Sequence, residues 1–248
     1  MAHQERKKIM KTWKKIVLGV SLISLFLGGG LVAWGYSQGG LTDLQNKTIS
    51  EQDYVKKEVK DFNKIDIKSS SYNVLIKNGE VDKATLSYYQ KTKNPIDTSV
   101  KDGQLTINDN NSELDSTSNK HINFFGLKDL VRLSTLNKEV RNKTIVITLP
   151  KKQTIDFLKV DLATGNLDLS NSTIKQADIN LNVGDLTFTK MIVSNLKANL
   201  DVGSVDSDHT LFTNSDLSIA MGDYSGDNLI FNGHNKLDVT SGDIEIAL

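Results

Sequence analysis

The carboxy-terminal part of this 248-residue chain repeats itself at a fixed interval. Glycine recurs after 19, 19, 19 and 20 residues, at Gly165, Gly184, Gly203, Gly222 and Gly242. A unit of this length cannot bury an apolar face alone, and it becomes stable only when it stacks on neighbouring units. This interval therefore constrains the fold more than any other feature of the sequence.

Apolar residues keep a constant distance from each glycine, and polar or small residues lie between them. Two residues after the glycines stand Leu167, Leu186, Val205, Tyr224 and Ile244. Three before stand Leu162, Leu181, Leu200, Ile219 and Val239, and five before stand Val160, Ile179, Ala198, Leu217 and Leu237. Each unit is therefore predicted to be a strand, a tight turn and a strand. The predicted fold class is all-β, a β-solenoid-like stack of about 19-residue repeats.

A column of charges predicts how the units stack. Six residues before the glycines the chain carries Lys159, Asp178, Lys197, Asp216 and Lys236. In parallel strands stacked in register, about 4.8 Å apart, these residues form a ladder of alternating sign. An antiparallel sandwich gives no reason for such a column.

The residues that follow the glycines leave two interpretations open. They are Asn166, Asp185, Ser204, Asp223 and Asp243. Glycine with Asn or Asp beside it is typical of a tight turn with positive φ, and this interpretation is favoured. The alternative is a stacked calcium site formed by Asp185, Asp223 and Asp243. Calcium-binding parallel β-helices, however, carry several glycines within a nine-residue repeat.

The amino-terminal part has the pattern of a membrane anchor. Residues 1–15 form a basic leader, residues 16–36 are uncharged and long enough to span a bilayer as one transmembrane helix, and residues 37–58 are predicted to be a tether. The excess of basic residues before the apolar segment predicts a cytoplasmic amino terminus and an extracytoplasmic β-repeat domain over residues 59–248. A cleaved signal peptide and a buried soluble helix are the alternatives, and the length of the segment argues against both.

Between the tether and the repeats the pattern is less regular. Alternating runs around Ile65, Val74, Leu105 and Ile145 predict strands, and Asp102-Gly103 predicts a hairpin turn. An insertion with a short helix is predicted over residues 121–136. Such a helix covers an apolar end of the β-structure, or it contacts a partner or the bilayer.

The sequence carries no catalytic signature. Cysteine is absent, and His3, His121, His209 and His234 do not have metal-ligand spacing. Nucleophile elbows, phosphate loops and dinucleotide fingerprints do not occur. We therefore predict that the protein is not an enzyme, and we assign no catalytic, cofactor-binding or metal residues and no cofactor.

Five segments together resemble a known family. They are Phe62–Ile67 (FNKIDI), Tyr72–Ile76 (YNVLI), Ile145–Pro150 (IVITLP), Leu162–Leu167 (LATGNL) and Val239–Ile244 (VTSGDI). In this order they resemble the bacterial "putative adhesin" family of β-strand-repeat proteins, a domain family of unknown function, over residues 60–248. The resemblance implies a tethered envelope protein of a Gram-positive bacterium, with links in some members to envelope-stress responses and to small membrane partners. It implies no catalytic residues.

The expected function follows from these features. We expect a single-pass cell-membrane protein that displays a non-catalytic β-repeat domain for binding or structural interaction. Expected partners are the membrane, an envelope protein or cell-wall component, and a second copy through the carboxy-terminal edge strand. Nucleic acid is not expected, because 30 basic and 30 acidic residues cancel. The alternative is a regulatory or sensor subunit of an envelope-stress response that acts with a membrane partner.

Overall fold

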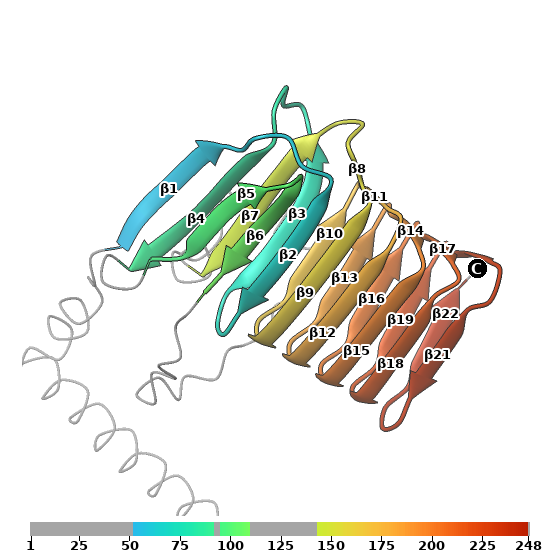
Figure 1. Ribbon diagram of the computed structural model, residues 1–248. Helices are drawn as coiled ribbons and strands as arrows, with labels where there is room; N and C mark the ends of the chain where they lie inside the picture. Colours follow the sequence, from blue (N-terminus) through green and yellow to red (C-terminus); the bar gives the residue numbers. More distant parts are fainter. Residues whose placement is uncertain (1–51, 92–94, 110–142, 248) are drawn as a thin grey trace, which may run out of the picture. The chain divides into compact units, whose positions relative to one another are not determined.

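The structure is a computed structural model that describes residues 52–91, 95–109 and 143–247. These residues form three sheets, which we call A, B and C (Figure 1). The chain divides into two compact units, residues 1–50 and 51–248, and all the described residues belong to the second. The described part is all-β, as the sequence predicts.

The order of strands in each sheet differs from their order in the sequence. Sheet A consists of β1 (Gln52–Glu58), β4 (Thr85–Lys91), β7 (Thr144–Pro150), β3 (Asn73–Gly79), β10 (Leu167–Ser170), β13 (Leu186–Thr189), β16 (Val205–Asp208), β19 (Tyr224–Asp227) and β22 (Ile244–Ala247). Sheet B consists of β5 (Asp97–Lys101), β6 (Gln104–Asn108), β2 (Lys64–Ser69), β9 (Phe157–Thr164), β12 (Ala177–Val183), β15 (Leu196–Val202), β18 (Asp216–Met221) and β21 (Lys236–Val239). Sheet C consists of β8 (Thr154–Ile155), β11 (Thr173–Ile174), β14 (Ile192–Ser194), β17 (Leu211–Thr213) and β20 (Ile230–Asn232).

The repeats stack as parallel rungs in register. Leu167 pairs with Leu186, and the same column continues through Val205 and Tyr224 to Ile244. A complete coil passes from sheet B through the glycine turn to sheet A, and then through sheet C to the next rung. The predicted stack is therefore confirmed, with one addition. The four coils from β9 to β20 each contain a third, short strand in sheet C that the two-strand interpretation did not include.

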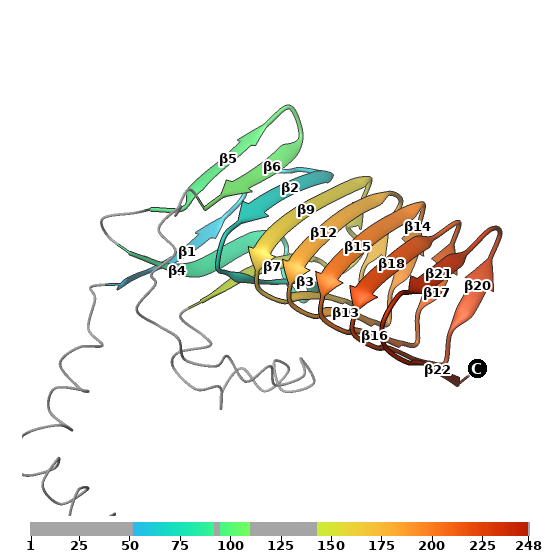
Figure 2. The same cartoon turned by 90° about the horizontal axis from the view of Figure 1, so that it is seen from below.

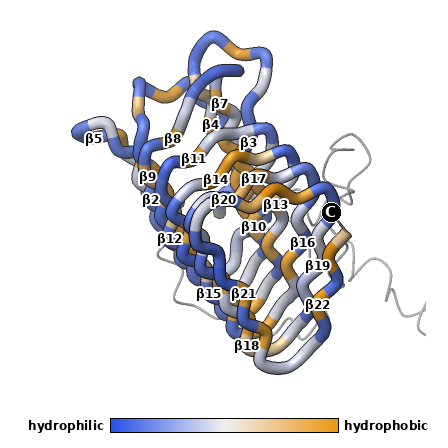
Figure 3. The backbone as a smooth tube through the Cα atoms, turned by 90° about the vertical axis from the view of Figure 1, so that its right-hand side faces the viewer, coloured by the Kyte–Doolittle hydropathy of each residue, from blue (hydrophilic) through white to orange (hydrophobic). Residues whose placement is uncertain are grey.

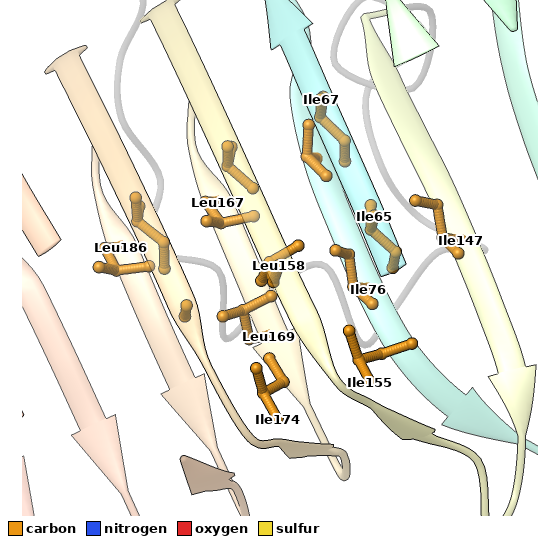
Figure 4. Packing of buried hydrophobic residues seen from close by; sticks show 14 of the residues in the cluster. Ile65, Ile67, Ile76, Ile147, Ile155, Leu158, Leu167, Leu169, Ile174 and Leu186 are labelled. Carbon is orange, nitrogen blue, oxygen red and sulfur yellow. The ribbon is translucent and has the colours of Figure 1, made fainter. Parts of the chain in front are cut away.

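The apolar columns form one continuous core. Figure 2 shows the strands of sheets A and B as two layers. Ile65, Ile76 and Leu167 point into the space between the two layers, where they meet other side chains from both sheets (Figure 4). Each is at most 1% exposed. Full burial of such a side chain is worth about 1.5–3 kcal/mol before conformational entropy is subtracted, so several stacked coils are needed for a stable domain.

The first coil of the sequence is not the first rung of the stack. Strand β2 lies between β6 and β9, and β3 lies between β7 and β10, in each case with parallel pairing. The rung built from β6 and β7 therefore precedes that of β2 and β3 in space, although it follows it in sequence. Strands β1, β4 and β5 run antiparallel to their neighbours and extend the sheets beyond this rung.

The local predictions for this region are confirmed. The turn between β5 and β6 has positive φ at both Asp102 and Gly103, as a two-residue hairpin requires. Strand β7 ends at Pro150, which cannot donate a hydrogen bond to a continuing ladder.

One boundary is wrong. The predicted tether over residues 37–58 includes β1, which pairs with β4 along its whole length. Its seven residues carry little apolar alternation, and only pairing with β4 defines them as a strand. The basic leader, the predicted transmembrane segment at 16–36 and the predicted helix at 121–136 lie outside the described residues. Within the described ranges, no helix has the length and apolar character needed to cross a bilayer.

Candidate interaction surface

Two constraints require glycine at these turn positions: the positive φ and the close approach of the neighbouring rung. Gly184, Gly203, Gly222 and Gly242 have φ between 142° and 151°, which confirms the predicted positive φ. A Cβ atom on any of them would lie 1.9–2.0 Å from the carbonyl oxygen of the glycine one rung earlier. The N–H groups of Gly184, Gly203 and Gly222 also donate to a carbonyl of the following rung, as from Gly184 to Val202 at 2.9 Å. The turns therefore stack backbone on backbone, where a side chain has no room.

The residue after each glycine extends a hydrogen-bond ladder. The Asn166 Oδ1 accepts from the Asp185 N–H at 3.0 Å, and the Asp185 Oδ1 accepts from the Ser204 N–H at 3.0 Å. The Ser204 Oγ and the Asp223 Oδ1 continue the ladder to Asp223 and Asp243. These contacts favour the turn interpretation over the calcium interpretation, because carboxylate oxygens of Asp185 and Asp223 already accept backbone N–H groups. Within the described ranges, no three His, Asp or Glu side chains are grouped to hold a metal ion.

The outer face of sheet B carries two polar columns. In one, the Asn199 Nδ2 donates to Asn180 and the Asn180 Nδ2 donates to Asp161, each at 3.0 Å. In the other, Lys159, Asp178, Lys197, Asp216 and Lys236 are neighbours in register, as the sequence predicts. The ion pairs of these lysines run along the strands, from Lys159 to Asp161 at 3.6 Å and from Lys236 to Asp238 at 3.7 Å. Such half-exposed pairs contribute at most about 1 kcal/mol each.

Sheet C exposes a stripe of large apolar side chains. Ile192, Leu211 and Ile230 are neighbours in register and face outward; Ile192 is 46% and Ile230 is 60% exposed. We call these three residues the sheet C stripe. The next residue in each strand faces the core, as Val193 and Phe212 do. Side chains of this kind add nothing to the core, and an exposed contiguous apolar surface is typical of an interaction site.

The sequence analysis missed this stripe. The signal was a pair of adjacent apolar residues eight and nine positions after Gly184, Gly203 and Gly222. In a strand, adjacent side chains point to opposite faces, so one member of each pair must face solvent.

A second apolar surface lies at the carboxy-terminal end of the stack. This end faces the viewer in Figure 3. Phe231, Ile244 and Ile246 are 41–50% exposed. Residues of the same columns one rung earlier are buried: Phe212 and Tyr224 are each 3% exposed. We call the last rung, β21 and β22, together with Phe231, the terminal face. In the described chain no strand pairs with its outer edge.

Two buried ionisable groups lie nearer the amino-terminal end. Burial raises the pKa of Asp168 from 3.8 to about 7, and Lys77 partly opposes that rise. Burial also raises the pKa of Tyr72 to about 12, with smaller contributions from Asp109 and Tyr88. The Tyr72 hydroxyl donates to the Tyr89 carbonyl at 3.0 Å. This hydrogen bond fixes the Tyr72 side chain against β4.

Two of the four histidines belong to the described residues, and both lie between strands. His209 is exposed with positive φ, and its Nδ1 lies 2.7 Å from Asp208 Oδ1. The His234 N–H donates to Asn214 Oδ1 at 3.1 Å. His3 and His121 lie outside the described residues.

A protein family described as "Toastrack DUF4097" matches residues 62–248, about three quarters of the chain. This chain belongs to the Toastrack family. The match confirms the resemblance inferred from the sequence, and its amino-terminal limit falls close to β2. The Toastrack region thus contains every rung of the stack and all the surfaces described above.

The solved structures that match this Toastrack domain share little sequence with it. A putative cell adhesion protein from Clostridium sporogenes is 14% identical, with 79% of this chain and 99% of that chain covered and a TM-score of 0.41. A putative adhesin from Bacteroides fragilis is 16% identical, with coverage of 79% and 97% and a TM-score of 0.34. No curated protein matches the sequence.

Proposed function

We propose that this protein is held in the cell membrane by residues 16–36 and displays its Toastrack domain outside the cytoplasm as a non-catalytic binding module. The observation that carries the binding role is the sheet C stripe, because Ile192 and Ile230 leave large apolar side chains exposed outside the core. The rungs hold these side chains at the spacing of neighbouring strands, about 4.8 Å. The proposed partner is an envelope protein or a cell-wall component with an apolar contact surface.

Photo-crosslinking in intact cells tests the binding role. A photoreactive residue at Leu211 is expected to capture a defined partner, and the same residue at Ser225, exposed on sheet A, is the control. Ile192→Asp with Ile230→Asp should abolish capture at position 211 without unfolding the domain, since both side chains already face water. Equal capture from positions 211 and 225, or capture that survives the double substitution, would contradict the proposal.

Cysteine labelling tests the location. The chain has no cysteine, so a single introduced thiol reports on one position. We expect a membrane-impermeant maleimide to label Ser225→Cys in intact cells and to label Ala2→Cys only after lysis. Labelling of both positions before lysis, or of neither, would rule out the proposed orientation.

A second role is favoured by Gly28, Gly29 and Gly30 in the apolar segment, because small residues allow membrane helices to pack closely. On this basis the protein acts as a regulatory subunit that reports envelope damage to a membrane partner. A crosslinker placed beside Gly29 should capture that partner. Crosslinking at position 211 without crosslinking beside Gly29 would rule out the regulatory role and support the binding module alone.

A further inference from the structure

The terminal face exposes what every other rung buries. Ile244 occupies the column of Leu167, Leu186, Val205 and Tyr224, which are 0–3% exposed, yet Ile244 is 50% exposed. Leu237 and Val239, which complete the inner side of the rung, are only partly buried. The face also presents the unpaired edges of β20, β21 and β22, which makes it a template for another strand.

We propose that two copies of this chain pair through their terminal faces about a twofold axis that passes near Leu237. Under this symmetry β21 pairs antiparallel with β21 of the second copy, and Leu237 lies opposite its own counterpart. The contact is isologous, so each copy contributes the same surface and the assembly closes as a dimer.

The charges of β21 select this arrangement. Lys236 and Asp238 point outward on either side of Leu237, and their side chains are more than half exposed. Antiparallel pairing centred on Leu237 places Lys236 opposite Asp238 of the second copy, and Asp238 opposite Lys236, so both pairs are attractive. Parallel pairing in register would instead place each charge opposite its own sign.

The same axis suits β22. Ile246 follows the turn at residues 240–243 by as many positions as Leu237 precedes it, so the two residues lie at the same height in the rung. Antiparallel pairing of β22 centred on Ile246 places Glu245 opposite Ala247 of the second copy, which avoids a clash between the two glutamates. The inward side chains of both strands then cover each other, as they do between rungs within one chain.

Charge exchange between two variants tests this pairing. In Lys236→Asp, two aspartates face each other at both symmetry-related contacts, and in Asp238→Lys two lysines do. Each variant alone should self-associate at least about tenfold more weakly than the unchanged chain. When the two variants are mixed, the heterodimer has opposite charges at both contacts, so association should recover. Sedimentation of the full-length chain in detergent, over a concentration series, measures all four samples.

Lys197→Asp is the matched control. It lies in the same charge column inside the stack, between Asp178 and Asp216, so it introduces more repulsion within the chain than Lys236→Asp does. It should nevertheless leave dimerisation unchanged. A monomeric unchanged chain, an unchanged dimer in the Lys236→Asp variant, or open filaments in place of dimers would each overturn the twofold pairing.

A disulfide provides a second measurement that does not depend on charge. Residues directly opposite in an antiparallel pair have Cα atoms about 4.5–5.5 Å apart, within the range that a disulfide bridges. In the cysteine-free chain, Leu237→Cys should therefore form an intermolecular disulfide under mild oxidation, and Ser225→Cys should not. Equal crosslinking of the two variants would contradict the proposed axis.

Discussion

The two ends of the β-stack are built differently. At the amino-terminal end, sheet A continues beyond the parallel rungs into β4 and β1, and sheet B into β5, all running antiparallel. The outermost strands there carry exposed charges, including Lys56, Lys57 and Lys101. Charged edge strands resist pairing with other chains. At the carboxy-terminal end the last rung keeps the parallel repeat and exposes Ile244 and Ile246.

The two ends show two ways in which a stack of parallel coils can stop. In a stack of parallel coils, each coil leaves free backbone groups and an apolar face on which the next coil can pair in the same register. Strands that run in the opposite direction break this propagation at one end. The carboxy-terminal end keeps an open edge of this kind. Substitutions there should cost less stability, and the edge offers a surface for association. A quasi-one-dimensional stack is also expected to be least stable at an uncovered end.

The largest expected effect compares two glycines of one column. In Gly203→Ala the new Cβ atom would lie 1.9 Å from the Gly184 carbonyl oxygen, in a rung held from both sides. We expect a loss of at least about 4 kcal/mol in the free energy of unfolding. Gly242→Ala meets the Gly222 oxygen at 2.0 Å, but its rung can separate locally, so we expect a loss below about 2 kcal/mol. Urea unfolding followed by circular dichroism measures both, and equal losses would argue against the difference between inner and end rungs.

The next effect compares two phenylalanines. Phe188 is completely buried and packs edge-to-face on Phe212, with ring centroids 5.3 Å apart. Phe188→Ala should cost about 3–5 kcal/mol through the cavity it creates. Phe231 is 43% exposed, so Phe231→Ala should cost about 1 kcal/mol. The same unfolding experiment provides the measurement, and a larger cost at Phe231 would show that its rung is covered in solution.

A third effect depends on pH. Because the pKa of Asp168 rises to about 7, the folded protein holds a proton between about pH 4 and 7 that the unfolded chain has lost. The free energy of unfolding should therefore fall as pH rises through this range and level off above it. Asp168→Asn should remove this slope, so that the variant gains about 2–3 kcal/mol relative to the unchanged chain between pH 5 and 8.

Asp206→Asn is the control for that experiment. Asp206 lies in the same column of sheet A two rungs further along, where its side chain is exposed. Comparison of the two profiles separates the effect of removing a buried carboxyl from that of removing an exposed one. An Asp168→Asn variant with the slope of the unchanged chain would show that Asp168 is ionised at low pH in the fold.

The smallest effect concerns the turn ladder. Asp185→Ala removes the acceptor of the Ser204 N–H and should cost about 1 kcal/mol. Asp223→Ala removes the equivalent acceptor for Asp243 in the last rung, and its cost should be smaller still. Amide exchange at Ser204 and Asp243 reports the two losses separately. A greater loss at Asp243 would reverse the expected order.

The sequence predicted the repeat well because its period is nearly constant. A fixed 19-residue interval places Leu167, Leu186 and Val205 in one column whatever the details of the turns, and it places the charge column beside them. The chemistry of the glycine turn was predicted in part. Positive φ follows from Gly followed by Asn or Asp, whereas the contact between successive glycine backbones appears only when rungs are stacked.

The irregular half was less predictable for a physical reason. Strand β2 pairs with β6 and β9, which are distant in sequence, and no local pattern encodes that order. Strand β1 is defined by its pairing with β4, since Gln52–Glu58 has little apolar alternation of its own. The sheet C stripe was not predicted, because its strands are only two or three residues long and too short to show an alternating pattern.

Hydrogen exchange of individual amides tests the central comparison most directly. The N–H groups of Leu186, Val205 and Tyr224 occupy equivalent positions and donate to Ser204, Asp223 and Asp243 of the next rung, at 2.9–3.0 Å. At a concentration where the chain sediments as a monomer, we predict that Leu186 and Val205 exchange slowly and Tyr224 markedly faster, because its acceptor lies in the uncovered rung. Equally slow exchange at all three amides would contradict an open carboxy-terminal end.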